Sequence, residues 1–218
     1  LSYRVSNLKK YKSLGLKNVQ MLRSWFDKDR TYPITLSKSD KKKFECDVVF
    51  VGHYEDDGRI KVLESILKQN LSFKLYGPEW NAVLKGHPTL GHLYPVEYLR
   101  GLDYAKALSG AKIALCFLSK INNDTYTRRC FEIPACKTMM LSEYSDDLSN
   151  LFEEGLEAEF FRSKEQLIKK LNFYLKNDKQ RRSVASNGYR RVFNDGHDID
   201  SRMLELIRHV ENTGDLNV

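Results

Sequence analysis

The sequence predicts an α/β fold, a Rossmann-like parallel sheet with flanking helices. Short continuous apolar runs, each stopped by glycine or polar residues, are typical of strands buried on both faces. Between them lie longer segments whose apolar residues recur every three or four positions, as on one face of a helix. Strands that alternate with helices require right-handed crossovers, which makes the strands parallel within one sheet.

The first part of the chain holds elements too small to bury a core of their own. Residues 6–14 look like a helix ended by a glycine, and residues 18–23 look like a short strand. Residues 27–43 contain a proline and a lysine run with little apolar periodicity, which predicts a linker. The chain begins with Leu, so we expect residues 1–45 to be the tail of a truncated N-terminal domain plus a linker, and residues 46–218 to form the main domain.

The main domain opens with a regular pattern. Residues 47–51 are a continuous apolar strand that a glycine stops, and residues 59–68 place isoleucine and leucine on one helical face. Residues 73–76 are a second strand, which ends at Gly-Pro because proline cannot continue the hydrogen-bond ladder. Residues 96–108 carry leucine and alanine at helical spacing, so we expect a helix there.

The second half of the domain continues the alternation. Residues 113–118 are an apolar strand, a short helix runs through Glu132, and residues 138–141 are another short strand. Helical periodicity predicts four further helices, at residues 145–152, 164–176, 178–193 and 199–211.

Composition limits the class of protein. Hydrophobic residues make up 41% of the 218 residues and charged residues 30%, which is typical of a globular protein. No apolar run approaches the roughly 20 residues that span a bilayer, and the N-terminus lacks the layout of a secretory signal, so we expect a cytoplasmic protein. The four cysteines form no CxxC pair, which favours buried thiols over a metal site or disulfides.

The net charge of +7 comes from one end of the chain. Residues 1–45 hold 12 Lys/Arg against 4 Asp/Glu, and the remainder is close to neutral. A basic segment ahead of a near-neutral domain does not favour a nucleic-acid partner. We favour a solvated linker and surface helix, and keep a peripheral contact with the inner face of the membrane as the alternative.

The most informative stretch is 122–136, which follows the apolar strand at 113–118. Hydroxyls and amides precede Arg128 and Arg129, and Glu132 follows within a short helix. Guanidinium forks suit phosphate oxygens, and a carboxylate accepts hydrogen bonds from a diol such as a ribose. The stretch therefore predicts a nucleotide site.

The position of the loops agrees with this prediction. Open parallel sheets bind ligands at the carboxyl ends of their strands. Residues 52–54, 76–77 and 120–129 each follow a predicted strand. We therefore expect the three loops to meet at one edge of the sheet.

Each candidate residue also has an ordinary explanation. Arg128 and Arg129 could be surface residues of a first helical turn, and Glu132 could be a solvated helix residue. Asp124 could be a helix cap. Arg59 could be solvated at a helix start, and His53 could be either a general acid/base or a packed loop residue.

Four segments carry a resemblance to a known family. They are residues 117–136, 50–59, 75–80 and 151–161, the first being the most specific. They resemble the donor-binding, C-terminal half of group 1 glycosyltransferases with the GT-B fold. Within that family the likeness is closest to the bacterial branch related to spore-maturation CgeB-like glycosyltransferases.

The resemblance implies roles for the residues of the most specific segment. Glu132 would bind the donor ribose, and Thr127, Arg128 or Arg129 would hold the diphosphate. Asp124 lies eight residues before Glu132, the spacing of paired acidic residues in many retaining members, and would contact the sugar. Asp124 is therefore a catalytic candidate.

Further donor contacts are implied in the surrounding loops. The backbone at Tyr94, Pro95 and Val96 would contact the nucleobase. Gly52 would let the donor phosphates approach the first loop, which is the loop after the strand at 47–51. The remaining candidates are Lys120, Asn123 and Thr125 for the donor nucleotide, Arg59 beside the first loop, and His53 as a second catalytic candidate. Such enzymes stabilise a departing diphosphate with cationic side chains, so the resemblance implies no metal and no cofactor besides the nucleotide-diphosphate sugar itself.

The chain departs from the family's pattern in two places. Lys137-Thr138 stands where relatives usually carry glycine, so the turn must tolerate a side chain or offer a new phosphate contact. Nearly all of the acceptor domain is missing, since residues 1–36 look like that domain's end. We therefore expect the chain to bind a donor without efficient turnover.

The function that the resemblance implies is sugar transfer from a nucleotide-diphosphate sugar to a glycan, lipid-linked or protein acceptor. The acceptor would be held by the N-terminal domain. Two other classes stay open. One is a nucleotide-sugar epimerase of GT-B-like fold, for which we place no catalytic carboxylates and histidine. The other is a non-catalytic nucleotide-binding or interaction module, which fold alone does not separate from an enzyme.

Overall fold

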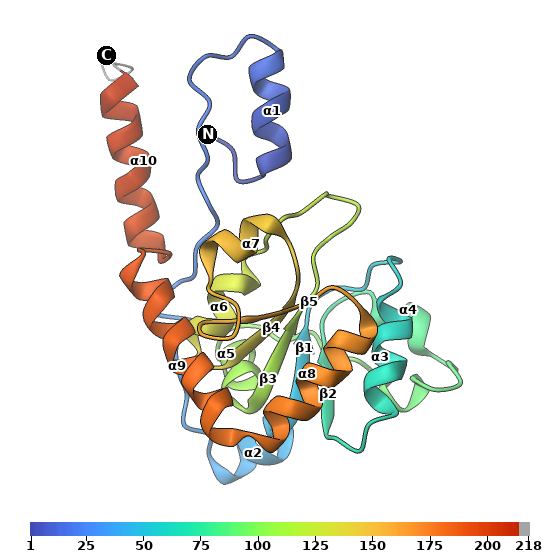
Figure 1. The fold of residues 1–218 in the computed structure, drawn as a ribbon. Helices are drawn as coiled ribbons and strands as arrows, with labels where there is room; N and C mark the ends of the chain where they lie inside the picture. Colours follow the sequence, from blue (N-terminus) through green and yellow to red (C-terminus); the bar gives the residue numbers. More distant parts are fainter. Residues whose placement is uncertain (214–218) are drawn as a thin grey trace.

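A five-stranded, all-parallel sheet forms the centre of the protein (Figure 1). The computed structural model describes residues 1–213. The strands are β1 (Cys46–Val51), β2 (Phe73–Tyr76), β3 (Ala111–Cys116), β4 (Met139–Glu143) and β5 (Glu159–Phe161), in the spatial order β2-β1-β3-β4-β5. The predicted α/β parallel architecture is confirmed.

Helices and helical turns connect and cover the strands. In chain order they are α1 (Val5–Ser13), α2 (Lys38–Phe44), α3 (Arg59–Leu67), α4 (Trp80–Leu84), the 3₁₀ turn η1 (Gly91–Leu93), α5 (Leu102–Ser109), α6 (Arg129–Ala135), α7 (Asp146–Leu151), α8 (Lys164–Lys176), α9 (Asp178–Asn194) and α10 (Ile199–Thr213).

The direction of strand addition reverses between β1 and β3. The chain crosses from β1 to β2 through α3 and returns from β2 to β3 through α5. Right-handed crossovers in opposite directions put their helices on opposite faces of the sheet. The buried apolar residues accordingly form one cluster with α5 and α6 and a second with α3 and α8. Such a reversal leaves a crevice at the carboxyl ends of the two strands.

The strands are apolar throughout because both of their faces are covered. Neighbouring rows of the sheet belong to different clusters: Val48, Ile113 and Met139 face α3 and α8, and Val49, Ala114 and Met140 face α5 and α6. All six are at most 1% exposed. This burial on both sides explains the continuous apolar runs in the sequence.

Two expected elements in the first half of the chain are wrong. The segment 18–23 is not a strand, because it makes only an isolated bridge, between Ser2 and Met21. The helix expected from residue 96 begins at Leu102. The preceding residues instead run beside the end of β2, where Gly77 N–H donates to Glu97 O at 2.9 Å.

The predicted linker at 27–43 is also partly wrong, because α2 begins within it. The Ser37 side chain caps this helix by accepting from Asp40 N at 3.1 Å. Phe44 at its end is 1% exposed and joins the core. The lysine run occupies the last turn of α2, where positive charge is favourable to the helix dipole.

Sequence patterning missed the short elements β5, α4 and η1. Strand β5 has only three residues, and its place at the sheet edge depends on pairing with β4. Such elements are too short to show a periodic pattern.

The segment before β1 is anchored to the sheet domain. Phe26 is fully buried, and its ring lies 4.9 Å from that of Phe193 in α9. Its backbone bridges the start of α10: Phe26 N–H donates to His197 O at 3.1 Å, and Ile199 N–H donates to Phe26 O at 3.0 Å. Figure 1 shows this segment passing from α1 along the domain to α2.

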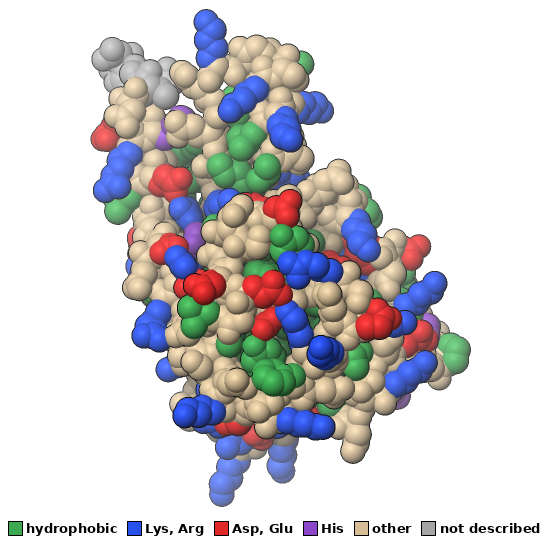
Figure 2. Space-filling model, in the orientation of Figure 1, with side chains coloured by type: hydrophobic (Ala, Val, Ile, Leu, Met, Phe, Trp, Pro, Cys, Tyr) green, Lys and Arg blue, Asp and Glu red, His purple; other side chains and the backbone are tan. Residues whose placement is uncertain are grey.

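The basic excess of residues 1–45 is spread over two ends of the molecule. Figure 1 places α1 and α2 at opposite ends, and Figure 2 shows Lys and Arg side chains gathered at both on this face. Among residues 1–213, no helix combines the length and the apolar character that a bilayer crossing needs.

We expect Phe26→Ala to lower the free energy of unfolding by about 3–5 kcal/mol, because it removes a fully buried ring. Chemical denaturation followed by circular dichroism would measure the loss. The control is Phe173→Ala, whose ring is 45% exposed and whose loss should be below about 1 kcal/mol. Equal losses in the two variants would show that the segment around Phe26 is only loosely attached.

We expect a second stability effect at His197, which is 3% exposed and stacks on Phe131 of α6 at 4.4 Å. Burial and the neighbouring Arg202 charge lower the pKa of His197 to about 4. The folded protein thus favours the neutral imidazole of His197. The resulting contribution to the free energy of unfolding is fully present above pH ~6.5 and is lost as the pH falls towards 4.

The measurement is the free energy of unfolding at pH 7 and pH 4.5. The parent should lose about 2–3 kcal/mol more than His197→Gln over this range, because Gln does not titrate. The same pH dependence in both proteins would contradict a buried neutral histidine.

Candidate functional site

A cleft of ≈ 550 Å³ opens at the carboxyl ends of β1 and β2. It lies beside the point where the strand order reverses, as expected for this kind of sheet. Its walls come from the loops after β1 and β2 (Val51, Gly52, His53, Gly77, Pro78), the segment entering α5 (Tyr98, Leu99, Arg100, Gly101, Tyr104), the start of α6 (Arg128, Arg129, Glu132) and the N-terminal segment (Asp27, Arg30, Thr31).

Arg129 is a half-buried cation in this cleft. Its guanidinium lies 5.9 Å from the centre of the Phe50 ring, and Nη2 donates a 3.4 Å hydrogen bond to Phe117 O. Within residues 1–213, its Nε has no hydrogen-bond partner and the guanidinium forms no salt bridge. Because an unpaired cation away from water is costly, this position suits an anionic ligand.

Glu132 is held one turn further along α6. The Tyr104 hydroxyl donates to Glu132 Oε2 at 2.6 Å, and Arg128 Nε lies 3.5 Å from Oε1. Burial raises the pKa of Glu132, against the opposing effects of the Tyr104 hydrogen bond and the two arginine charges. Tyr104 thus occupies Oε2 with a hydrogen bond, whereas Oε1 has only the longer ion pair with Arg128 among the contacts within residues 1–213.

Arg128 connects the cleft to the N-terminal segment. Its side chain is 52% exposed, and its Nε donates to Trp25 O at 2.9 Å. The guanidinium also lies 5.6 Å from the centre of the Trp25 ring. Arg128 thus has a carboxylate within ion-pair distance, whereas Arg129 forms no salt bridge within residues 1–213.

Two glycines let the cleft loops approach each other closely. A Cβ on Gly52 would lie 2.7 Å from the Phe50 ring and 3.3 Å from Arg129 Nη1. Gly77 has φ +138°, and a Cβ there would lie 2.0 Å from Gly52 O. No side chain therefore fits at Gly52, and the expected approach of donor phosphates to this loop remains a prediction.

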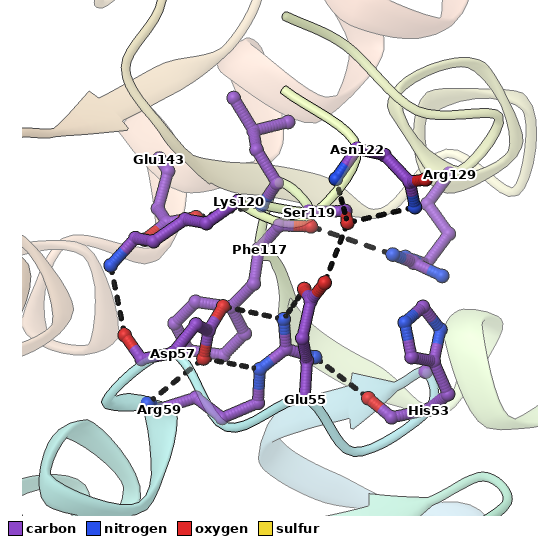
Figure 3. Close-up of polar contacts among 12 residues, drawn as sticks. His53, Glu55, Asp57, Arg59, Phe117, Ser119, Lys120, Asn122, Arg129 and Glu143 are labelled. Atoms are coloured by element: carbon purple, nitrogen blue, oxygen red, sulfur yellow. Dashed lines mark hydrogen bonds and ion pairs between the residues drawn. The ribbon is translucent and has the colours of Figure 1, made fainter. Parts of the chain in front are cut away.

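The structure brings five of the predicted site residues together. Gly52, His53, Arg128, Arg129 and Glu132 all line the cleft. Figure 3 shows the His53 ring directed towards the Arg129 guanidinium. The cleft therefore combines cations, an imidazole and a carboxylate.

Three other candidates line a different hollow, of ≈ 730 Å³, beside the carboxyl ends of β3 to β5. They are Lys120, Asn123 and Asp124. Asp124 is ion-paired with Arg4 at 2.8 Å, and Lys120 Nζ donates to Asp57 O at 2.9 Å. Their predicted donor contacts remain predictions.

Thr125 and Thr127 line neither hollow. Thr125 Oγ1 donates to Asp147 Oδ2 at 2.7 Å, and Thr127 Oγ1 lies 3.5 Å from Cys116 Sγ. Both hydroxyls have partners inside the protein.

The segment 94–96 also lies outside the cleft lining. The Asn81 side chain holds it by bonding Val96 N at 2.7 Å and Val96 O at 3.1 Å. The residues that follow, 98–101, line the cleft instead, together with Tyr104. Sequence reasoning missed these residues because it placed them in a helix.

Arg59 departs from the expected role, because it does not line the cleft. Its side chain is 2% exposed and pairs with Glu55 and Asp57, each at 2.7 Å.

Lys137 is exposed, adopts φ +57°, and borders a hollow at the amino ends of the strands. The turn after α6 therefore tolerates a side chain rather than directing Lys137 towards the cleft.

No group of three or more His, Cys, Asp or Glu side chains in residues 1–213 is arranged to hold a metal ion. The four cysteines, which were expected to be buried thiols, are buried and free.

With the fold and the cleft described, comparison with known families identifies the one to which the chain belongs. Residues 59–208 match the glycosyl transferase-like family. Since the match covers more than half of the 218 residues, the chain belongs to this family. No curated protein sequence matches the chain significantly.

Several solved structures share the fold. The C-terminal domain of the group 1 protein LpcC from Francisella tularensis matches at TM-score 0.60 and 14% identity, covering 80% of this chain and 99% of that one. HepE from Anabaena, solved with UDP-glucose, matches at 0.73 and 13%, covering 99% and 63%. Sucrose-phosphate synthase from Thermosynechococcus elongatus matches at 0.71 and 13%, covering 97% and 57%.

These likenesses confirm the predicted fold, the Rossmann-like C-terminal half of a GT-B protein. The chain spans nearly all of the LpcC domain, but only 63% of the HepE chain and 57% of the synthase chain.

We expect Gly52→Ala to lower the free energy of unfolding by about 1–3 kcal/mol, because the new methyl group displaces the Phe50 ring. Gly91→Ala is the control, since the nearest atom to its Cβ would lie at an ordinary 3.6 Å. Thermal and urea denaturation of both variants would measure the difference. A loss at Gly52 no larger than that at Gly91 would show that the first loop has room for a side chain.

Proposed function

We propose that the cleft binds the nucleoside diphosphate of a nucleotide-sugar, and that the chain is the donor-binding portion of a glycosyltransferase. The observation that carries this proposal is Arg129, a half-buried guanidinium without a carboxylate partner in the described chain. A diphosphate supplies the missing negative charge in a geometry that a guanidinium fork matches.

The other groups of the cleft fit the rest of a nucleoside diphosphate. Glu132 Oε1 accepts hydrogen bonds from the ribose diol, while Tyr104 holds Oε2. The segment 98–101 offers backbone and the exposed Tyr98 ring to the nucleobase. His53, on the Arg129 side of the first loop, approaches the phosphates or the sugar (Figure 3). The HepE structure with UDP-glucose gives this donor class a precedent in the same fold.

The acceptor side belongs to the same proposal. Residues 1–45 would be the end of an acceptor-binding domain plus its linker, and residues 46–218 the donor domain. The sugar would pass to a glycan, lipid-linked or protein acceptor, with Asp124 contacting it. A cytoplasmic location at the inner face of the membrane and membership of the CgeB-like branch complete the proposal.

The test is isothermal titration calorimetry of the chain with UDP, GDP, ADP and TDP. We expect Arg129→Ala to weaken binding of the preferred diphosphate about 10- to 100-fold, because a charge-assisted bidentate contact is lost. The same variant should bind the matching nucleoside nearly as well as the parent. Glu132→Ala should weaken the nucleoside and the diphosphate alike.

The control is Arg182→Ala, which removes a 77% exposed arginine near the amino ends of the strands, away from the cleft. It should bind as the parent does. If no diphosphate binds the parent below roughly millimolar concentrations, while single-stranded nucleic acid binds with steep salt dependence, the donor proposal fails.

A further inference from the structure

A buried polar network lies directly behind the first loop of the cleft (Figure 3). Its centre is Arg59 at the start of α3, with Glu55 and Asp57 from the loop before it. Their side chains are 2%, 3% and 4% exposed. Arg59 Nη2 donates to Glu55 Oε2 at 2.7 Å, and Arg59 Nε donates to Asp57 Oδ1 at 2.8 Å.

The network also forms hydrogen bonds with the backbone of the loop after β1. Arg59 Nη1 donates to His53 O at 2.7 Å, and Arg59 N–H donates to Asp57 Oδ1 at 3.1 Å. Burial opposes the charge on Asp57, but the hydrogen bonds and charge of Arg59 hold the pKa of Asp57 below its usual value. The loop that carries His53 is therefore fixed from behind by a charged side chain.

The same network reaches across the strand reversal to the loop after β3. Ser119 Oγ donates to Glu55 Oε1 at 2.6 Å, and Lys120 Nζ donates to Asp57 O at 2.9 Å. Ser119 Oγ in turn accepts from Asn122 N at 3.1 Å and from Asn122 Nδ2 at 2.9 Å. The Ser119 hydroxyl and the Lys120 ammonium group thus both connect the loop after β1 to the loop after β3.

Each of the two loops holds a group beside Arg129 in the cleft. The loop after β1 holds His53, and Phe117 in the strand extension after β3 accepts from Arg129 through its carbonyl oxygen at 3.4 Å. The rings of Phe50 and Phe117 lie 4.9 Å apart, with Arg59 5.9 and 5.7 Å from their centres. Arg129 lies 5.9 Å from the Phe50 centre. A change in the spacing of the loops therefore changes where His53 stands relative to Arg129.

We propose that Arg59, Glu55 and Ser119 are positioning residues that set the spacing between the two loops and so the fit of the cleft to a diphosphate. None of the three lines the cleft, so each acts through His53 or Arg129. The inference rests on the proposed donor site. It gives Arg59, expected from the sequence to touch the donor, an indirect role.

The test compares Ser119→Ala with Thr138→Val. Both variants remove one buried hydroxyl, since Ser119 is 5% and Thr138 4% exposed, and Thr138 Oγ1 donates to Leu108 O at 2.7 Å near the amino ends of the strands. We expect Ser119→Ala to raise the Kd for UDP about tenfold. Thr138→Val should leave that Kd within about twofold, although both variants lose thermal stability.

Two further measurements separate positioning from general weakening. Amide hydrogen exchange should accelerate in both loops, at 52–58 and 117–123, in Ser119→Ala and in neither loop of Thr138→Val. The double variant Ser119→Ala, Glu55→Gln should bind UDP about as weakly as the weaker single variant, because both changes break one network.

Different results would contradict the positioning role and the proposed function. Parent-like UDP affinity in Ser119→Ala, equal loss in Thr138→Val, or additive losses in the double variant would each overturn the positioning role and leave the proposed function standing. Failure of the parent to bind any of UDP, GDP, ADP and TDP would overturn the proposed function and this inference with it.

Discussion

The reversal of strand order between β1 and β3 is the constraint on which the site depends. It leaves no loop crossing between the carboxyl ends of these two strands. The cleft lies beside this point, at the carboxyl ends of β1 and β2, and the start of α6 forms one of its walls. Gly52 keeps that space open, since a side chain would meet the Phe50 ring and Arg129. The guanidinium of Arg129 then occupies a position where, within residues 1–213, it forms no salt bridge and its Nε has no hydrogen-bond partner.

The segment before β1 is part of this arrangement rather than an appendage. The Tyr126 hydroxyl, in the loop before α6, donates to Tyr3 O at 2.7 Å and accepts from Ser24 N at 2.9 Å. Arg4 pairs with Asp124, and Trp25 O receives Arg128 Nε. The loop that leads into α6 is therefore held in place by contacts with residues near the N-terminus. The N-terminal segment therefore contacts Asp124 and Arg128 directly.

The sequence sufficed for what is local and periodic. Strand β2 and helix α8 have the predicted bounds, because one is an apolar run stopped by Gly-Pro and the other has a long amphipathic pattern. The start of α5 was mispredicted, since Leu99 fits the helical spacing but its segment pairs with the end of β2. The role of Arg59 was also beyond the sequence. Its spacing from Glu55 suits a helix surface pair, and only tertiary packing shows that both are buried.

Burial of Arg59, Glu55 and Asp57 needs a reason other than stability. Removing such charges from water costs free energy that their mutual attraction does not always repay, and apolar residues at such sites are often as stable or more so. Directional hydrogen bonds, however, fix relative positions that interchangeable apolar contacts do not. A network that ties His53 O to Ser119 through Arg59 and Glu55 fits a requirement for geometry at the neighbouring cleft. Ser119 takes part in three hydrogen bonds: two from Asn122 fix the hydroxyl within its own loop, and the third joins it to Glu55 of the other loop.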